Sequence, residues 1–161
     1  MVGLEIDRKF LVQDRTILAG LPATHYRQGH LSTDPARTVR VRRAGERAFL
    51  TMKGASAGLT RAEYDEIPPA YVDELLDGLA LAPLVEKRRH RPAADGVTWE
   101  IDVFEVDHAD LVRVEVELSR ADHPLAIPLW AGAEVTDDPR YPNANLLAHP
   151  CRAWWERERV P

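Results

Sequence analysis

The sequence predicts a mainly β protein with short helical inserts, folded as a single domain over residues 1–161. Two observations support this class. Most of the strong segments alternate apolar and polar residues with a period of two, which is typical of strands. The chain is also 45% hydrophobic with a net charge of −5, a composition that suits one compact core and excludes a disordered chain.

Alternation predicts seven strands, several of them joined by short turns. They cover residues 4–12, 38–43, 47–53, 59–67, 85–91, 97–103 and 111–118. A tight turn is expected at residues 44–46, a hairpin loop at 54–58, and a further turn at Asp95 and Gly96. The strands therefore follow one another closely, as they do in sheets built from hairpins.

Helices are expected at three places, one of them strongly patterned. Val72, Leu75, Leu76 and Leu79 recur at three- and four-residue intervals, which predicts an amphipathic helix within residues 68–81 that covers the sheet. Residues 14–21 give a weaker helical pattern. The C-terminal residues, about 143–161, predict a helical tail that Pro150 interrupts or kinks.

Composition excludes several kinds of protein. Cys151 is the only cysteine, which rules out an internal disulfide framework and a cysteine-based zinc cluster. Charged residues arrive too early for a signal peptide, and no apolar run approaches the roughly 18 residues of a membrane span. We therefore expect a cytoplasmic protein without membrane contact, whose oligomeric state the sequence leaves open.

Charge is divided unevenly along the chain. Residues 1–65 hold 11 Lys and Arg against 7 Asp and Glu, whereas residues 66–161 hold 10 against 19. If both parts close on one cavity, the first supplies mainly cations and the second mainly carboxylates. The acidic total makes a general nucleic-acid binder unexpected.

The charged residues of each predicted strand share one face, because residues i and i+2 point to the same side of a strand. Three strands repeat an acid-x-Asp pattern and a fourth has Glu-x-Glu; the pairs are Glu5 and Asp7, Glu63 and Asp65, Glu100 and Asp102, Glu115 and Glu117. One interpretation is a half-buried sheet whose charged face meets water. The other is a closed barrel whose charged face lines a tunnel, where a polyanion chelated with Mg²⁺ or Mn²⁺ would balance the charges.

Short motifs follow one another in a fixed order along the chain. The first is EIDRKFLV at residues 5–12. Others follow in order: QGHLS at 28–32, VRVRR at 39–43, LTMKG at 50–54, RAEYD at 61–65, WEIDVF at 99–104, VEVEL at 114–118, EVT at 134–136 and RYPNA at 140–144. The ordered set resembles the CYTH domain, or triphosphate tunnel metalloenzyme, superfamily, in its short bacterial single-domain branch, and the first motif is similar to the ExExK pattern of that superfamily. The resemblance implies an eight-stranded antiparallel closed β-barrel with a charged lumen and flanking helices.

The resemblance also implies site residues. Phosphate-binding residues would be Lys9, Arg40, Arg42, Lys53, Lys87 and Arg89. A first metal ion would be held by Glu5, Asp7 and Glu117. Candidates for a second metal ion or for orienting water are Glu63, Asp65, Asp102 and Glu115. Arg61 would either contact phosphate or neutralise Glu63.

Two positions depart from the family pattern. Asp7 stands where the ExExK pattern has Glu, which keeps the charge but shortens the reach by one methylene. His30 stands where relatives have Tyr, so that an imidazole either contacts phosphate or fills the tunnel edge. Both readings of His30 stay open.

The resulting hypothesis is metal-dependent hydrolysis of a small triphosphate, foremost inorganic tripolyphosphate, by water attack inside the tunnel. Lys9, Glu63, Asp102 and Glu115 would be the catalytic residues. The alternatives are a module that binds polyphosphate or a nucleotide without turnover, a class IV adenylate cyclase, and a thiamine triphosphatase. Among nucleic acids, the resemblance leaves only a 5′-triphosphate end open as a partner.

Overall fold

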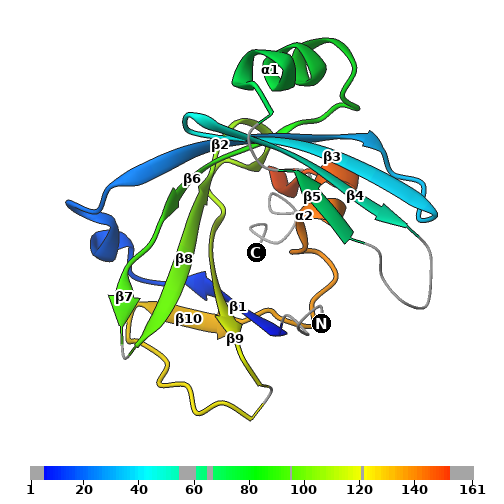
Figure 1. Ribbon diagram of the computed structural model, residues 1–161. Helices are drawn as coiled ribbons and strands as arrows, with labels where there is room; N and C mark the ends of the chain where they lie inside the picture. The colour runs from blue at the N-terminus through cyan, green and yellow to red at the C-terminus, as the bar shows by residue number, and fades with distance from the viewer. Residues whose placement is uncertain (1–5, 55–60, 65–66, 95, 121, 153–161) are drawn as a thin grey trace.

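The chain forms one antiparallel sheet that curls round on itself (Figure 1). The computed structural model describes residues 6–54, 61–64, 67–94, 96–120 and 122–152. The strands are β1 (Ile6–Val12), β2 (Ala23–Ser32), β3 (Arg37–Ala44), β4 (Arg47–Gly54), β5 (Arg61–Tyr64), β6 (Val85–His90), β7 (Ala93–Ala94), β8 (Val97–Phe104), β9 (Val112–Leu118) and β10 (Ala131–Glu134). They are ordered β10-β1-β9-β8-β6-β2-β3-β4-β5, and β7 pairs with β8.

The curved antiparallel sheet confirms the predicted fold class, whereas the predicted number of eight strands is wrong. The described residues form ten strands, because the two-residue strand β7 and the short strand β10 add to the longer ones. The sheet has β10 at one edge and β5 at the other, and no backbone pairing joins these two edges within the described residues. Closure of the sheet into a barrel therefore stays a prediction.

All seven predicted strands are present with shifted ends, but β2 was not predicted. This strand is ten residues long and lies near the middle of the sheet, paired with β3 and β6. Its sequence, ATHYRQGHLS, places Tyr26, Gln28 and His30 on one face and His25 and Arg27 on the other. Because both faces carry polar residues, the strand lacks the apolar contrast that marks the others.

The helices are few and short. Helix α1 (Pro69–Gly78) confirms the predicted amphipathic helix, and α2 (Asn143–Ala148) ends before Pro150 as expected. The predicted helix at residues 14–21 is only a 3₁₀-helix, η1 (Arg15–Leu18), and a second one, η2, spans Val106–His108. Within the described part of the chain, no helix has the length and apolar character needed to cross a membrane.

Helix α1 covers the convex face of β2, β3 and β4 (Figure 1). Its buried Val72 and Leu76 pack against Val41 and Ala48. Gly29 permits this packing, because a Cβ atom there would lie 2.7 Å from Leu84 Cδ2. Two ion pairs, Arg27 with Asp77 at 2.9 Å and Arg43 with Asp73, attach the helix to the sheet.

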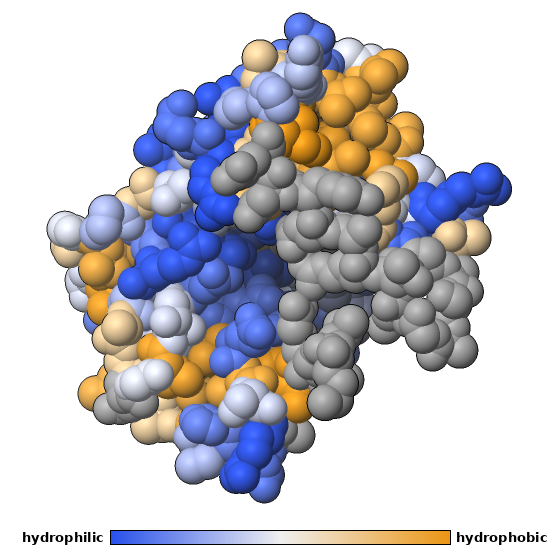
Figure 2. Space-filling model, in the orientation of Figure 1, coloured by the Kyte–Doolittle hydropathy of each residue, from blue (hydrophilic) through white to orange (hydrophobic). Residues whose placement is uncertain are grey.

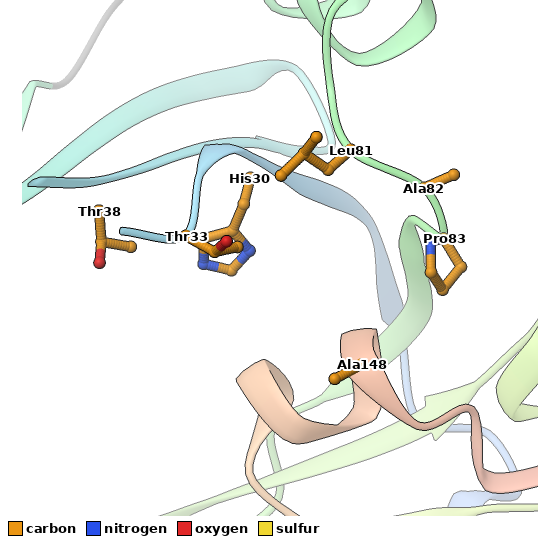
Figure 3. Close-up of a pocket in the computed structure, with 7 residues that line it drawn as sticks. All are labelled: His30, Thr33, Thr38, Leu81, Ala82, Pro83 and Ala148. Atoms are coloured by element: carbon orange, nitrogen blue, oxygen red, sulfur yellow. The ribbon is translucent and has the colours of Figure 1, made fainter. Parts of the chain in front are cut away.

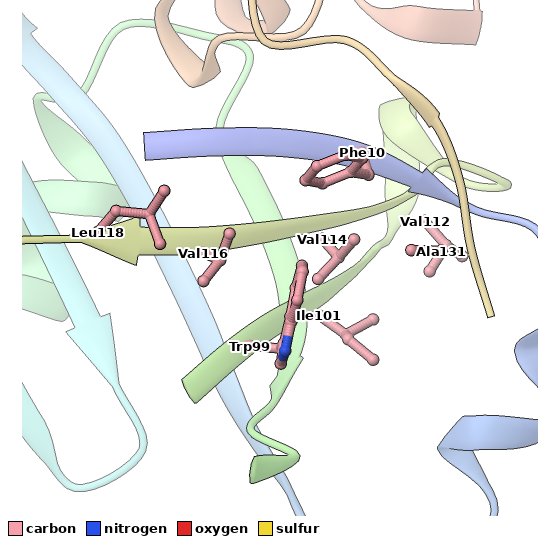
Figure 4. Close-up of a cluster of buried hydrophobic side chains, with 8 residues drawn as sticks. All are labelled: Phe10, Trp99, Ile101, Val112, Val114, Val116, Leu118 and Ala131. Carbon is pink, nitrogen blue, oxygen red and sulfur yellow. The ribbon is translucent and has the colours of Figure 1, made fainter. Parts of the chain in front are cut away.

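A second apolar cluster covers the convex face of β1, β8, β9 and β10 (Figure 4). At its centre Trp99 lies between Phe10 and Trp130, with ring centroids 6.0 and 5.5 Å away. The outer side of this cluster is covered by segments that are not α-helical. Leu18 of η1 and Leu125, in the chain between β9 and β10, pack against it. The expectation that helices cover the apolar face is therefore correct only for α1, because the chain between β9 and β10 and the chain after β1 take that place here.

A third apolar cluster lies on the concave side, where α2 packs within the curve of the sheet (Figure 1). Leu146 of α2 and Tyr141 just before it contact the inward-facing Val85 and Phe104, and both belong to one buried cluster with Leu111. We call this cluster the plug; its members are Val85, Phe104, Leu111, Val135, Tyr141, Leu146 and Cys151, with Leu11 packed against them. The plug fills one end of the concave face.

Candidate active site

The concave face carries a charged cavity of about 440 Å³ next to the plug. Figure 2 shows hydrophilic residues gathered around a hollow at the centre of the molecule. The cavity is lined by Asp7, Lys9, Gln28, His30, Thr38, Arg40, Thr51, Lys53, Arg113, Glu115 and Pro142. The charged faces predicted from alternation therefore point inward, as the tunnel interpretation requires.

The cavity is built from strands that are distant in sequence but adjacent in the sheet. In β1 and β9, Lys9 is paired with Glu115 and Asp7 with Glu117. In β3 and β4, Arg40 is paired with Thr51. Directly paired residues of antiparallel strands have side chains on the same face, so each pairing brings two polar groups together at the cavity wall.

Lys9 lies between two carboxylates. Its Nζ is 3.6 Å from Oδ2 of Asp7 and 3.6 Å from Oε1 of Glu115. Burial and the neighbouring Glu115 raise the pKa of Asp7, and Glu117 raises it further, because nearby negative charge disfavours ionisation. Burial acts in the same direction on Glu115, but Arg113 and Lys9 outweigh it and lower the pKa of that carboxyl.

Asp102 lies at the centre of a buried network of three cations. It accepts hydrogen bonds from Lys87 at 2.6 Å and from Arg89 at 2.6 and 2.8 Å, and Arg113 Nη2 is 3.6 Å from its Oδ2. Burial alone would raise the pKa of Asp102, but the three cations hold it well below its usual range. Burial lowers the pKa of Lys87 to about 8, although Asp102 opposes this effect.

Arg113 connects this network to the cavity and to the plug. Its Nη2 is 3.4 Å from Oε2 of Glu115, and its Nη1 donates to the backbone carbonyl of Tyr141. Its guanidinium also lies over the Phe104 ring, 5.2 Å from the centroid. The plug segment therefore fixes the position of a cation that lines the cavity.

The wall formed by β2, β3 and β4 is rich in hydrogen-bond donors. Arg40 Nη2 donates to Thr51 Oγ1 at 3.3 Å. Gln28 is buried and lines the cavity, and its Nε2 has no hydrogen-bond partner among the described residues. Arg42 lies beside the cavity, over the rings of Phe49 and Tyr26 at 4.7 and 5.9 Å.

His30 lies at the edge of the cavity and is only 9% exposed. Its pKa is lowered by burial and by the charges of Arg40 and Lys53. The imidazole is therefore predominantly neutral at neutral pH, which makes one ring nitrogen a donor and the other an acceptor.

The structure brings most of the predicted site residues to this region. The cavity is lined by Asp7, Lys9, His30, Arg40, Lys53 and Glu115, whereas Arg42, Lys87, Arg89, Asp102 and Glu117 lie around it without lining it. Arg61 and Glu63 occupy positions in β5 opposite Lys53 and Thr51, but their side chains lie outside the described part of the structure. Glu5 and Asp65 lie entirely outside the described residues.

Several lining residues had no predicted role. Arg113 was not predicted as a site residue, although it shares the charged face of its strand with Glu115 and both line the cavity. Gln28, Thr38 and Thr51 are neutral, so a search for inward charges did not select them. Their cross-strand partners are the signal that could have found them, because Gln28 is paired with Arg42, Thr51 with Arg40 and Thr38 with Lys53.

A separate group of possible metal ligands lies on the opposite face of the sheet. The ligand atoms of His25, Glu86 and Glu105 lie within 4.8 Å of one another. Both carboxylates already have cationic neighbours, because Arg88 donates to Glu105 at 2.7 Å and Arg27 Nε is 3.5 Å from Glu86. This group does not belong to the cavity.

The known proteins that resemble this chain agree with the geometry. The model of the CYTH domain family matches residues 3–142. The chain belongs to the CYTH domain family. This CYTH protein is 38% identical over 156 residues to an inorganic triphosphatase of Acetivibrio thermocellus, covering 96% of this chain and all of that one. It is 39% identical over 148 residues to an inorganic triphosphatase of Nitrosomonas europaea, covering 88% and 95%.

A solved structure also matches most of the CYTH chain. The crystal structure of the inorganic triphosphatase NE1496 superposes with a TM-score of 0.70 at 34% identity, covering 91% of this chain and 95% of that one. The predicted family membership is therefore confirmed by sequence and by structure.

Proposed function

We propose that this CYTH protein is an inorganic triphosphatase that hydrolyses the terminal phosphoanhydride bond of tripolyphosphate. The observation that carries the proposal is the charged cavity, in which Lys9, Arg40, Lys53 and Arg113 meet the carboxylates of Asp7 and Glu115. The two relatives that share 38% and 39% identity with the chain bear the name inorganic triphosphatase.

The cations of the cavity would bind the phosphate oxygens. Guanidinium and ammonium groups form strong charge-assisted hydrogen bonds to phosphate, and Arg40, Lys53, Lys9 and Arg113 lie along the wall. Gln28 Nε2 supplies a further buried donor. Further positive charge would come from residues that lie behind the cavity wall, namely Arg42, Lys87 and Arg89. Asp102 would hold Lys87, Arg89 and Arg113 in position.

The carboxylate end of the cavity suits a divalent cation such as Mg²⁺ or Mn²⁺. Asp7 is paired with Glu117 in the sheet, and burial together with the neighbouring carboxylates raises the pKa of Asp7. A hard cation bound there would offset the repulsion between these carboxylates. Asp7 and Glu117 would hold the ion, together with Glu5 and Asp65. When bound, the metal ion neutralises phosphate charge and acts as a Lewis acid.

We assign to Glu115 the role of orienting and deprotonating the attacking water molecule. Its lowered pKa keeps it ionised, and it lies beside both Lys9 and Arg113. It would orient a water molecule towards the terminal phosphorus and accept its proton, with Lys9 and Arg113 stabilising charge on the phosphate oxygens. The bridging oxygen would leave with the electron pair of the broken P–O bond, giving orthophosphate and diphosphate.

We further propose that the sheet closes into a tunnel. The register of β5 places Glu63 opposite Thr51 and Arg61 opposite Lys53, two residues that line the cavity. Arg61 and Glu63 would then belong to the same charged surface, with Arg61 at phosphate or at Glu63 and with Glu63 as a further catalytic carboxylate. A closed tunnel would screen the anhydride from bulk water.

The function is tested by measuring orthophosphate release from tripolyphosphate with the purified protein. We expect turnover with Mg²⁺ or Mn²⁺, its loss in excess chelator, and its recovery when either ion is restored. Full turnover in excess chelator would remove the metal from the proposal, and absence of phosphate release with both ions would contradict the proposed function.

A further inference from the structure

Three possible metal ligands converge on the outer face of the sheet, away from the plug and the charged cavity. They come from separate segments: His25 from β2, Glu86 from β6, and Glu105 from the chain just after β8. Their ligand atoms lie within 4.8 Å of one another. The three side chains are 44%, 28% and 30% exposed, so an ion can reach them from solvent.

Backbone hydrogen bonds hold the three ligands next to one another. Strands β2 and β6 are antiparallel neighbours in the sheet. The N–H of Glu105 donates to the carbonyl of Glu86 at 2.9 Å, and the N–H of Gly45 donates to the carbonyl of His25 at 2.9 Å. The backbone at each ligand is therefore already ordered, which lowers the entropic cost of binding an ion.

The distances around His25 match those between two ligands of one ion. Its Nε2 is 3.6 Å from Oε2 of Glu86 and 3.4 Å from Oε2 of Glu105. A ring N–H that donates to a carboxylate would lie closer, at about 2.7–3.2 Å. Ligand atoms that lie about 2.0–2.2 Å from a tetrahedral Zn²⁺ ion are about 3.3–3.6 Å apart. Both separations from the imidazole therefore have the size that a zinc ion requires.

The carboxylate oxygens that face away from His25 are held by arginines. Arg88 Nε donates to Oε1 of Glu105 at 2.7 Å, and Arg27 Nε is 3.5 Å from Oε1 of Glu86. Each guanidinium thus occupies one oxygen and leaves the other, Oε2, towards the imidazole. Hydrogen-bond partners of this kind orient the ligating carboxylates of metal sites.

We propose that His25, Glu86 and Glu105 bind one Zn²⁺ ion on the outer face of the sheet, with water at the fourth position. One imidazole with two carboxylates suits zinc, whereas Mg²⁺ prefers oxygen ligands alone. The ion would link β2, β6 and the chain after β8, and it would stabilise the folded chain because the unfolded chain lacks the site. Zinc binding at this place is independent of the proposed triphosphatase function.

Isothermal titration calorimetry with Zn²⁺ tests the site in the full-length protein. The protein is stripped of metal and then kept in excess Mg²⁺, so that the charged cavity is supplied with its own ion. We expect one Zn²⁺ per chain in the wild type, and binding weakened at least about tenfold in His25→Ala and in the nearly isosteric Glu105→Gln. His123→Ala is the matched control and should bind like the wild type, because His123 belongs to no such ligand group among the described residues.

Thermal unfolding gives a second readout in the same four proteins. An ion that binds only the folded chain raises Tm. Added Zn²⁺ should therefore raise the Tm of the wild type and of His123→Ala, and it should leave the Tm of His25→Ala and Glu105→Gln nearly unchanged. Circular dichroism without zinc shows that each variant is folded before it is titrated.

The outcomes separate the zinc site from the triphosphatase. Absence of Zn²⁺ binding in excess Mg²⁺, or equal Zn²⁺ affinity in the wild type and in the two ligand variants, would overturn the site. Hydrolysis of tripolyphosphate with Mg²⁺ should be the same in His25→Ala as in the wild type. A loss of zinc binding with unchanged hydrolysis would support a site that is separate from the cavity, whereas parallel loss of both in a folded variant would contradict it.

Discussion

The plug and the charged cavity occupy the same concave face, yet their chemistry is opposite. Four stretches of chain carry apolar inward residues at the plug and charged inward residues in or beside the cavity. In β1 the inward positions change from Leu11 at the plug to Lys9 and Asp7 at the cavity. In β6 they change from Val85 at the plug to Lys87 and Arg89. In β8 the inward positions change from Phe104 to Asp102. Leu111, just before β9, belongs to the plug, whereas Arg113 and Glu115 of β9 line the cavity, so a boundary between apolar and charged residues crosses the concave face.

This boundary explains how the site tolerates buried charge. Lys87, Asp102 and Arg113 are 0–1% exposed and lie directly against the plug, which keeps water away from them. Charges interact more strongly where water is excluded, and each buried charge needs partners to offset its desolvation. The plug therefore excludes water from one side of the site, and we expect the substrate to bind from the open side.

Removing the central carboxylate should have the largest effect. Asp102→Ala leaves three neighbouring cations without their common partner, and we expect a loss of about 3–5 kcal/mol in the free energy of unfolding. Urea denaturation measures it. Glu105→Ala is the control, because Glu105 pairs with the exposed Arg88 and should cost at most about 1 kcal/mol. Equal losses in the two variants would contradict the role of Asp102.

Truncating a buried side chain of the plug should have the next largest effect on stability. Leu146 is fully buried in the plug, so Leu146→Ala should lower the free energy of unfolding by about 2–5 kcal/mol. Thermal or urea denaturation checks it against Leu129→Ala, whose side chain is 93% exposed and which should unfold like the wild type. A wild-type free energy of unfolding for Leu146→Ala would contradict the packing of α2 into the plug at this end of the concave face.

A smaller effect is expected from pH. Lys87 has a pKa of about 8, so it carries its charge below that pH and loses it above. The kcat/KM for tripolyphosphate should therefore fall as the pH rises through about 8, and Lys87→Arg should move this limb to higher pH. Arg88→Ala, at the neighbouring outward position, should leave the limb in place. An identical profile for wild type and Lys87→Arg would exclude Lys87 as the titrating group.

Much of this arrangement could be predicted from local sequence. Alternation identifies Lys9, Arg40 and Glu115 as members of charged faces, because the direction of a side chain depends on its position within its own strand. The inward orientation of those faces also agrees with the family resemblance. Strand β2 escaped prediction because both of its faces are polar.

The rest depends on contacts between segments far apart in the chain. The three cations around Asp102 come from β6 and β9, and only the register of the sheet brings them together. The C-terminal segment was expected to be helical, but nothing in its own pattern places Leu146 against Phe104. A second cavity, of about 430 Å³, likewise joins His30 of β2, Thr38 of β3, Pro83 before β6 and Ala148 of α2 (Figure 3).

The central claim is that inward charges, and not outward ones, bind and turn over the triphosphate. Lys9 and Arg8 are adjacent in β1, but Lys9 lines the cavity whereas Arg8 pairs with Glu134 outside it. Steady-state hydrolysis of tripolyphosphate by Lys9→Ala and Arg8→Ala tests the claim most directly. We predict at least a tenfold loss of kcat/KM for Lys9→Ala, about 1.4 kcal/mol of barrier, and a change within about twofold for Arg8→Ala. Equal activity of the two folded variants would contradict the account.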